Sequence, residues 1–567
     1  MTSWRSAVQV SYIPVLHPFT LVVIHMNPVS FAQRFTAAEM LAYCVLDLFP
    51  GALLLEGDAT KEGFFYDFVI SQPIDDQIIS LLEENFRTLS KSNSPIKILE
   101  MMRENAAQLF RHQKQSLKSE LVARDENNVV SVLKMGTFHD MTTAALLPST
   151  DNLGSAKILK IEKIPSEYDV YEGEIVRIQG ILQSNPQALK KFVKLYDSHA
   201  EVDHRLLGKE MRLFAWDETV SKNLFWLPRG VQFLDELSNW WREAIIKQGF
   251  KIVQLPPREE ALTSFIKLQS REAGDLPKRW AQKIFTEQST TRALYGLLDH
   301  PAFYQDLLTI YCTPEQVKGE LISSLQFFEE TLKIFGFEKQ WILVANKASQ
   351  AGITRSSWEA AKQLLKEALK ACDLPLLEEE GKEALEGPYL ELLVRDSLGR
   401  DWPLSNLRIN LKLPEGCKLR IPGSLGEAKM PFLLQGSLAG SFDRLAALLL
   451  ENSKGSLPFW VTPEQVRVLC MGKQYASYAE EVFQVLEKGF RTTLELSETA
   501  LGAKVHLAER EKVPYMVIIG NKEQQSGLVT VRSSNKKEEF SLIKLEDFLK
   551  KVTRELQESK KLESTKT

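Results

Sequence analysis

The sequence predicts an α+β fold of several domains, and two patterns support this class. In the middle of the chain, the apolar segments 390–395 and 402–413 are joined by Asp396-Ser-Leu-Gly399, whose composition suits a tight turn, so they predict paired strands of one antiparallel sheet. From about residue 465 onward, strand-like and helix-like segments alternate, which predicts an α/β sandwich. The length of 567 residues suggests three or four domains, at roughly 150 residues each.

The first part of the chain is predicted to contain helices and at least one strand. Apolar residues recur at helical spacing between Phe31 and Phe49, and Pro50-Gly51 ends the pattern. A strand begins near Phe64-Phe-Tyr-Asp-Phe68, and the turn-forming segment Leu147 to Gly154 marks a loop. A second helical stretch is expected from Pro186 to Glu210, in one or two pieces.

A long amphipathic helix and a strand are predicted next. After Leu227-Pro-Arg-Gly230, five apolar residues lie at helical spacing, namely Phe233, Leu237, Trp240, Trp241 and Ala244. Gly249 ends this helix, and the apolar segment Phe250 to Pro256 predicts a strand. Thr313-Pro-Glu-Gln316 has the pattern of a capping box with proline at the first helical position, so a helix is expected from there through Phe335.

The alternation near the C-terminus gives strands and helices in turn. Strands are predicted at 466–470, 492–496 and 515–519, and helices around Ala479 to Leu486 and Gly502 to Arg510. The Lys- and Glu-rich tail from Gln557 is expected to be the fraying end of a helix.

The composition is that of an ordinary globular protein. With 70 Lys and Arg against 74 Asp and Glu the net charge is -4, so any contact with nucleic acid must come from local basic patches. The apolar run from Tyr12 to Met26 is too short and too interrupted by proline to span a membrane. The cysteines are far apart and form no CxxC pair, which favours reduced thiols and a cytoplasmic location; they are Cys44, Cys312, Cys372, Cys417 and Cys470.

No motif of the sequence indicates catalysis by itself. The GxGxxG, P-loop, GxSxG and HExxH patterns are all absent. His199 and His204, the closest pair of histidines, do not share a helix face at their spacing, so a metal role is not expected. The carboxylate runs Glu259-Glu260 and Glu378-Glu-Glu380 are interpreted as solvated surface.

Several phrases resemble the threonyl-tRNA synthetase family, in the family's order, from about Phe31 to Leu556. Leu457-Pro-Phe-Trp-Val-Thr-Pro463 and Lys512-Val-Pro-Tyr-Met-Val-Ile-Ile-Gly-Asn-Lys-Glu523 are similar to the family's anticodon-binding domain. Further matching phrases lie at 48–51, 63–68, 203–210, 225–230, 275–277, 312–316, 335–337, 396–402 and 440–444.

The resemblance implies a class II synthetase architecture in four parts. We expect a short N-terminal segment without the family's TGS domain (1–30) and an editing-like α+β domain with a linker helix (31–195). A catalytic-like domain built on an antiparallel sheet (196–455) and an α/β anticodon-binding domain with a charged tail (456–567) follow. The helix that bears Trp240 and Trp241 lies where the family dimerises, and its aromatic content suits a buried interface.

The family's editing and zinc-binding positions are replaced. The editing histidines and cysteine of the family correspond to Phe35, Glu39, Thr142 and Leu146, so hydrolysis of misacylated tRNA is expected to be lost. The family's zinc ligands, one Cys and two His, correspond to Glu259, Thr309 and Gln435. This set lacks thiolate and imidazole, and no zinc is expected.

The family's ATP-binding positions are largely replaced as well. The motif 2 arginines correspond to Glu287 and Asp299, whose negative charge would repel phosphates. Arg444 of motif 3 is retained, either as a contact to an ATP phosphate or as a salt-bridge partner. No ATP cofactor is expected.

The anticodon-binding module keeps more of the family's pattern. Glu523 and Arg532 match two positions that contact anticodon bases in the family, while Glu498 replaces an asparagine. Lys504, with Lys512 and Lys522, adds positive charge for RNA. The alternative interpretation is that Glu523 and Arg532 are surface remnants without function.

These observations lead to one interpretation and two alternatives. The chain is expected to be a threonyl-tRNA synthetase-like protein without aminoacylation or editing that binds tRNA or associates with a synthetase, as a homodimer or heterodimer and not at a membrane. The first alternative is an active threonine–tRNA ligase with a zinc-free site. The second is an amino-acid sensor that keeps a pocket.

Overall fold

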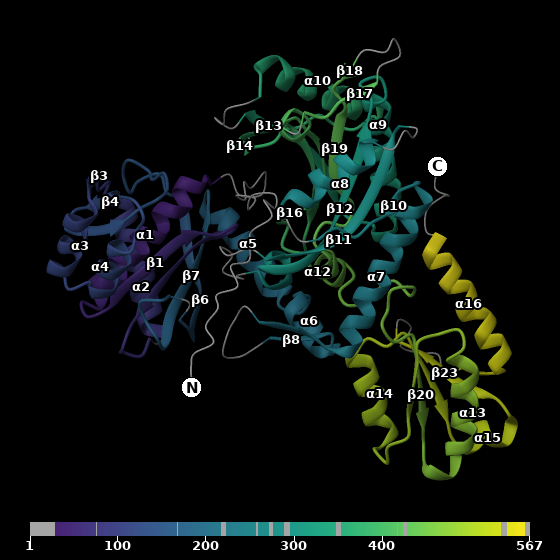
Figure 1. Ribbon diagram of the computed structural model, residues 1–567. Helices are drawn as coiled ribbons and strands as arrows, with labels where there is room; N and C mark the ends of the chain where they lie inside the picture. Colours follow the sequence, from purple (N-terminus) through teal and green to yellow (C-terminus); the bar gives the residue numbers. More distant parts are fainter. Residues whose placement is uncertain are drawn as a thin grey trace, which may run out of the picture. The chain divides into compact units, whose positions relative to one another are not determined.

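The computed structural model describes residues 29–74, 76–166, 168–216, 223–256, 259–271, 276–287, 295–347, 353–416, 418–422, 428–534 and 541–561 (Figure 1). These residues divide into two compact units, one up to His199 and one from Ala200 onward. The boundary expected at residue 195 falls inside the last helix of the first unit. The described residues contain no helix that is long and apolar enough to cross a membrane.

The first unit has a four-stranded antiparallel sheet of order β1-β2-β7-β6. Helix α1 (Phe31–Leu48) packs on this sheet, and a capping box of Ser30 and Gln33 fixes its start. Most of its periodic apolar residues are buried, as the sequence predicts, whereas Phe31 at its start is 42% exposed. The other elements are β1 (Leu53–Ala59), β2 (Gly63–Val69), α2 (Asp76–Lys91), β6 (Ser155–Pro165), β7 (Glu174–Gln183) and α5 (Pro186–His199).

A second, smaller sheet belongs to the same unit. Its order is β3-β4-β5, and it packs against two short helices around Phe110 and Val132. Its elements are β3 (Ile96–Met102), α3 (Arg103–His112), α4 (Ser116–Ala123), β4 (Val129–Met135) and β5 (Phe138–Met141). The segment 147–154 is a loop, as predicted.

The second unit begins with a large sheet of order β10-β11-β12-β19-β16-β15-β13-β14. It is antiparallel except for the edge pairs β10–β11 and β13–β14. Gly399, at φ 77°, lies in the predicted turn between β15 and β16. The strands are β10 (Lys251–Ile252), β11 (Lys278–Glu287), β12 (Ala302–Cys312), β13 (Lys339–Lys347), β14 (Glu378–Ala384), β15 (Tyr389–Arg395), β16 (Asp401–Asn410) and β19 (Phe432–Ser437).

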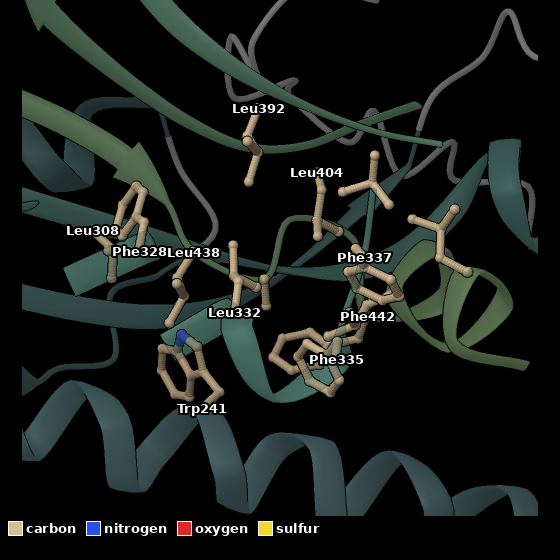
Figure 2. Packing of buried hydrophobic residues seen from close by; sticks show 14 of the residues in the cluster. Trp241, Leu308, Phe328, Leu332, Phe335, Phe337, Leu392, Leu404, Leu438 and Phe442 are labelled. Atoms are coloured by element: carbon tan, nitrogen blue, oxygen red, sulfur yellow. The ribbon is translucent and has the colours of Figure 1, made fainter. Parts of the chain in front are cut away.

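Helices cover one face of this sheet and form the largest apolar core. Figure 2 shows Trp241, Phe328 and Phe442 from three helices packed among leucines of the strands. The indole Nε1 of Trp241 donates to the buried Asp306 carboxylate at 3.0 Å. The remaining elements of this part are α6 (His204–Glu210), β8 (Phe214–Trp216), β9 (Leu224–Trp226), α7 (Pro228–Lys247), α8 (Glu259–Arg271), η1 (Gly296–Asp299), α9 (Val317–Leu332), η2 (Lys333–Phe335), α10 (Arg355–Ala371), α11 (Lys412–Gly416), β17 (Ile421–Pro422), β18 (Ala428–Lys429) and α12 (Phe442–Asn452). Among them, α8 packs through Ile266 on the other face of the sheet, in a separate cluster with Trp280 and Leu433.

The burial of the α7 tryptophans changes one argument from sequence. Trp241 is buried in the core of its own chain, and Trp240 stacks edge-on with Phe335 at 4.8 Å between ring centroids. Their aromatic rings therefore stabilise this fold, and they supply no argument for a dimer interface.

The C-terminal part of the second unit is a five-stranded sheet of order β21-β20-β22-β23-β24. Figure 1 shows α13 and α16 on one side of this sheet and α14 on the other, in agreement with two separate apolar clusters. The elements are β20 (Val466–Cys470), η3 (Lys473–Tyr475), α13 (Ala476–Leu486), β21 (Thr492–Glu495), α14 (Leu501–Arg510), β22 (Tyr515–Ile519), α15 (Asn521–Ser526), β23 (Val529–Ser533), β24 (Ser541–Ile543) and α16 (Leu545–Lys561).

Two element predictions differ from the structure. The helix expected from Thr313 begins at Val317, because the preceding residues form a turn in which the Gln316 side chain accepts from Thr313 N–H at 3.0 Å. That contact is half of the predicted capping box. The strand expected over 250–256 is reduced to Lys251–Ile252, since only these two residues pair with β11.

Candidate active site and tRNA interface

A polar row crosses the large sheet on the face opposite the main core. Thr309 lies directly opposite Gln435, Gln435 opposite Arg408, and Arg408 opposite Tyr389. Successive residues of a strand point to opposite faces, so directly paired residues share a face. The row therefore brings together two of the predicted zinc positions, Thr309 and Gln435.

The side chains of these two positions do not fit a zinc ion. The Gln435 amide oxygen accepts from Asn410 Nδ2 at 2.6 Å, and Thr309 is buried. Both positions offer neutral oxygen, whereas protein zinc sites are built mainly from thiolate and imidazole. Glu259 starts α8, and its side chain lies outside the described residues.

Ion pairs occupy the rest of the row. Arg408 Nη1 donates to Glu386 Oε2 at 2.7 Å, and its guanidinium lies 5.1 Å from the centre of the Tyr389 ring. Two residues along β15, Glu391 accepts from the buried Lys382 ammonium at 2.6 Å. The sequence reasoning did not identify these residues. The signal in the sequence is the alternation along β15 and β16, because every second residue of a strand points to the same face.

Arg444 is tied to backbone carbonyls. Its Nε donates to Leu298 O at 2.6 Å and its Nη1 to Pro403 O at 2.8 Å, while Asp299 Oδ1 lies 3.8 Å from Nη2. Burial lowers the pKa of the guanidinium, and the charge of Asp299 opposes this. The arginine thus fastens α12 to η1 and β16.

The two residues that replace the motif 2 arginines, Glu287 and Asp299, lie at different places in the segment from β11 to β12. Glu287 is exposed at the end of β11, opposite Ala302. Asp299, by contrast, lies in η1 beside Arg444. An ATP phosphate at either carboxylate would meet like charge.

Three ligating side chains converge at α6, but their atoms are already engaged. His204 Nδ1 lies 2.7 Å from Glu451 Oε1, and His204 Nε2 accepts from Leu297 N–H at 3.1 Å. Asp203 binds Arg205 through both of its oxygens. Both ring nitrogens have hydrogen-bond partners, so this group connects α6, η1 and α12.

In the first unit, the predicted editing positions surround a buried charged cluster. Glu39 is buried near Asp140, and Asp140 accepts from Lys118 Nζ at 2.7 Å and from the Tyr66 hydroxyl. Burial raises the pKa of Glu39 well above its usual value, and the Asp140 charge raises it further. The Glu39 carboxyl therefore keeps its proton to a higher pH than an exposed glutamate does.

The other three editing positions are structural. Phe35 is buried and stacks with Phe31, and Leu146 packs against the apolar core under α1. The Thr142 hydroxyl donates to Ala144 O at 3.2 Å. Phe35 and Leu146 are apolar and the Thr142 hydroxyl is bonded to the backbone, so Glu39 is the one ionisable side chain among the four predicted editing positions.

In the C-terminal part of the second unit, the side chains of Glu523 and Lys504 are hydrogen-bonded within the fold. Glu523 accepts from Gly520 N–H at 2.9 Å and from the Thr530 hydroxyl at 2.5 Å, which fixes the start of α15. Lys504 is buried, and its ammonium donates to Cys470 O and Ser497 O at 2.7 and 2.6 Å. An RNA contact by either residue, which stays a prediction, would require these bonds to break.

Arg532 and Glu498 are more accessible. Arg532 pairs with Glu509 of α14. Glu498 is exposed and pairs with the exposed Lys473 at 2.7 Å. Their partners lie in helices of the same module, Glu509 in α14 and Lys473 in η3.

Comparison with known proteins agrees with this architecture. Residues 465–555 match the family model of the anticodon binding domain. The threonine–tRNA ligase of Sulfurovum sp. (strain NBC37-1) is 27% identical over 565 residues, which cover 93% of each chain. The threonine–tRNA ligase of Aquifex aeolicus (strain VF5) is 29% identical over 88% of this chain and 85% of that relative.

Solved structures share the fold. The RNA binding domain of threonyl-tRNA synthetase from Cryptosporidium parvum Iowa II gives a TM-score of 0.56 at 25% identity, over 62% of this chain and 98% of that one. A putative threonyl-tRNA synthetase from Aeropyrum pernix gives 0.52 at 17% identity, over 63% and 96%. With the antiparallel sheet, the anticodon-binding module and near full-length relatives all in agreement, this chain belongs to the threonyl-tRNA synthetase family.

Proposed function

We propose that this protein is a tRNA-binding member of the threonyl-tRNA synthetase family that has lost aminoacylation and editing. The observation that carries the proposal is a contrast within the second unit. The anticodon-binding module has a well-packed core on both faces of its sheet. On the polar face of the large sheet, by contrast, the side chains are already bonded to one another, Gln435 to Asn410 and Arg408 to Glu386.

Electrostatics supports the loss of threonine activation. Adenylate formation requires fixed cations at the α-phosphate, and removal of a single preorganised donor costs about 2.7–4 kcal/mol of transition-state stabilisation. Arg444 is the arginine retained from motifs 2 and 3, and it is bonded to two carbonyls beside Asp299. A phosphate would have to break these bonds and approach a carboxylate.

Three measurements on the purified full-length protein test the proposal. We expect no stoichiometric zinc by elemental analysis, threonine-dependent ATP–pyrophosphate exchange at background, and tRNA binding at low salt by fluorescence anisotropy. An active threonine–tRNA ligase serves as the positive control for exchange. One zinc per chain, or exchange that disappears in Arg444→Ala, would contradict the loss of catalysis, and absence of tRNA binding would contradict the binding function.

An active threonine–tRNA ligase with a remodelled zinc-free site is the second candidate. It is favoured by the relatives named above, which are threonine–tRNA ligases matched over 85–93% of their length. The exchange assay separates the two candidates, because only the ligase turns over ATP.

A dimer through α7, with a second copy or with a synthetase, is part of the proposal. The outward stripe of this helix carries Val231 and Ile246, which are 45% and 55% exposed. Light scattering is expected to give a dimer mass for the wild type and a monomer for Ile246→Glu. A monomeric wild type would contradict the proposed dimer.

A further inference from the structure

An ion pair on the α14 face of the C-terminal sheet differs from the other predicted RNA contacts. Arg532 lies opposite Met516, and Met516 packs with Ala508 of α14, so Arg532 is on the α14 face. There it pairs with Glu509, and the two side chains are 19% and 37% exposed. Both partners can therefore reach solvent, unlike the buried Lys504 and Glu523.

A cavity of about 530 Å³ adjoins Glu509, the acidic partner of this pair. Glu509 and Ser534 line it, together with the basic residues His506, Arg510 and Lys512, and Glu210 contributes from α6. Without Glu509, the cavity wall would carry an excess of positive charge. Such a surface attracts a polyanion over short range even though the whole chain has a net charge of -4.

The chemistry of the pair allows one anion to replace another. The planar guanidinium donates in the same fork geometry to a carboxylate and to a phosphate diester. A partly exposed ion pair is weak, so exchange of Glu509 for an RNA phosphate loses little. The negative Glu509 in the same cavity also repels the incoming phosphate until it moves away.

We propose that Glu509 regulates RNA binding by holding Arg532 in the free protein, and that a phosphate diester of RNA takes its place in this cavity. Arg510 and Lys512 provide the further positive charge. This inference rests on the proposed tRNA-binding function and adds to it a residue that weakens the binding.

Four full-length proteins and a control variant test it. The affinity for a tRNA transcript is measured by anisotropy at low salt for the wild type, Glu509→Gln, Arg532→Gln and the double variant. We expect Glu509→Gln to bind roughly three- to tenfold more tightly, because Arg532 is released and a repulsive charge is removed. In the Arg532→Gln background, the same change is expected to have a much smaller effect.

Glu558→Gln is the matched control. It removes one negative charge from an arginine pair in the same module, Arg554–Glu558, on the opposite face of the sheet. If it tightens binding as much as Glu509→Gln does, or if Glu509→Gln acts equally with and without Arg532, the inference is wrong. Thermal unfolding verifies that each variant is folded.

The outcomes separate this inference from the function on which it depends. Wild type that binds tRNA as tightly as Glu509→Gln overturns the inference alone. Wild type that binds tRNA, but more weakly than Glu509→Gln, with the difference lost in the Arg532→Gln background, supports it. If no variant binds at low salt, the tRNA-binding function fails, and the inference fails with it.

Discussion

Glu39 shows how the burial of one carboxyl makes the stability of the fold depend on pH. Its carboxyl is buried against Asp140, with Lys118 and Tyr66 in the same cluster, and burial raises the pKa of Glu39 well above the usual value. An acid with a raised pKa in the folded state retains a proton that the unfolded chain loses, so stability falls as pH rises above the usual Glu pKa of about 4.3. A pKa change of one unit on folding corresponds to about 1.4 kcal/mol.

Glu39→Gln is therefore expected to stabilise the first unit at neutral pH by about 1 kcal/mol or more. The amide keeps a donor for Asp140 and has no proton to lose. The gain in melting temperature over wild type should shrink as the pH is lowered toward 4.5. Glu120→Gln, at an exposed i,i+4 pair with Arg124, is the control and should change little. A less stable Glu39→Gln at pH 8 would show that Glu39 is ionised in the fold.

At the scale of elements, a buried ionic network joins α7 to the C-terminal sheet. Arg229, at the start of α7, contacts Glu464, and its Nη2 donates to Glu511 O at 3.2 Å. Arg467 of β20 binds both of these carboxylates. The two glutamates are buried, so each needs its cationic partners.

Arg229→Gln is expected to destabilise the contact between α7 and the C-terminal sheet by about 3 kcal/mol, because two buried carboxylates would then share Arg467. Hydrogen exchange should rise first in β20 and α14, and the melting temperature should fall. Arg554→Gln removes an exposed pair on α16 and should change the melting temperature little. Equal effects of the two substitutions would mean that the network is not needed for docking of the module.

At the scale of the whole molecule, net charge and local charge act in opposite directions on RNA. A net charge of -4 provides no long-range attraction, so the proposed tRNA binding depends on local cations, and we expect those near the cavity to contribute. We expect the slope of log affinity against log salt to be reduced by about one in Arg532→Gln. Binding titrations at four or more salt concentrations measure the slope. An unchanged slope would place the phosphate contacts elsewhere.

The sequence predicted the architecture better than the site. Periodic apolar residues and turn glycines such as Gly399 act locally, so α1, α7, β15, β16 and the C-terminal alternation were predicted correctly. The pairing of Arg408 with Glu386 joins a strand to a loop, and that of Lys118 with Asp140 joins a helix to a strand, each across 22 positions of sequence. Such contacts depend on sheet register, which pattern alone does not specify.

The mutual pairing along the polar row also bears on how a metal site could be engineered on this face. Histidine at position 435 would remove the amide oxygen that accepts from Asn410 at 2.6 Å and leave Asn410 with its longer contact of 3.3 Å to Glu386. A second histidine, at position 309 directly opposite, would still give a zinc ion only two imidazole ligands. Because neighbouring side chains are coupled, a zinc site here would require several coordinated substitutions rather than one.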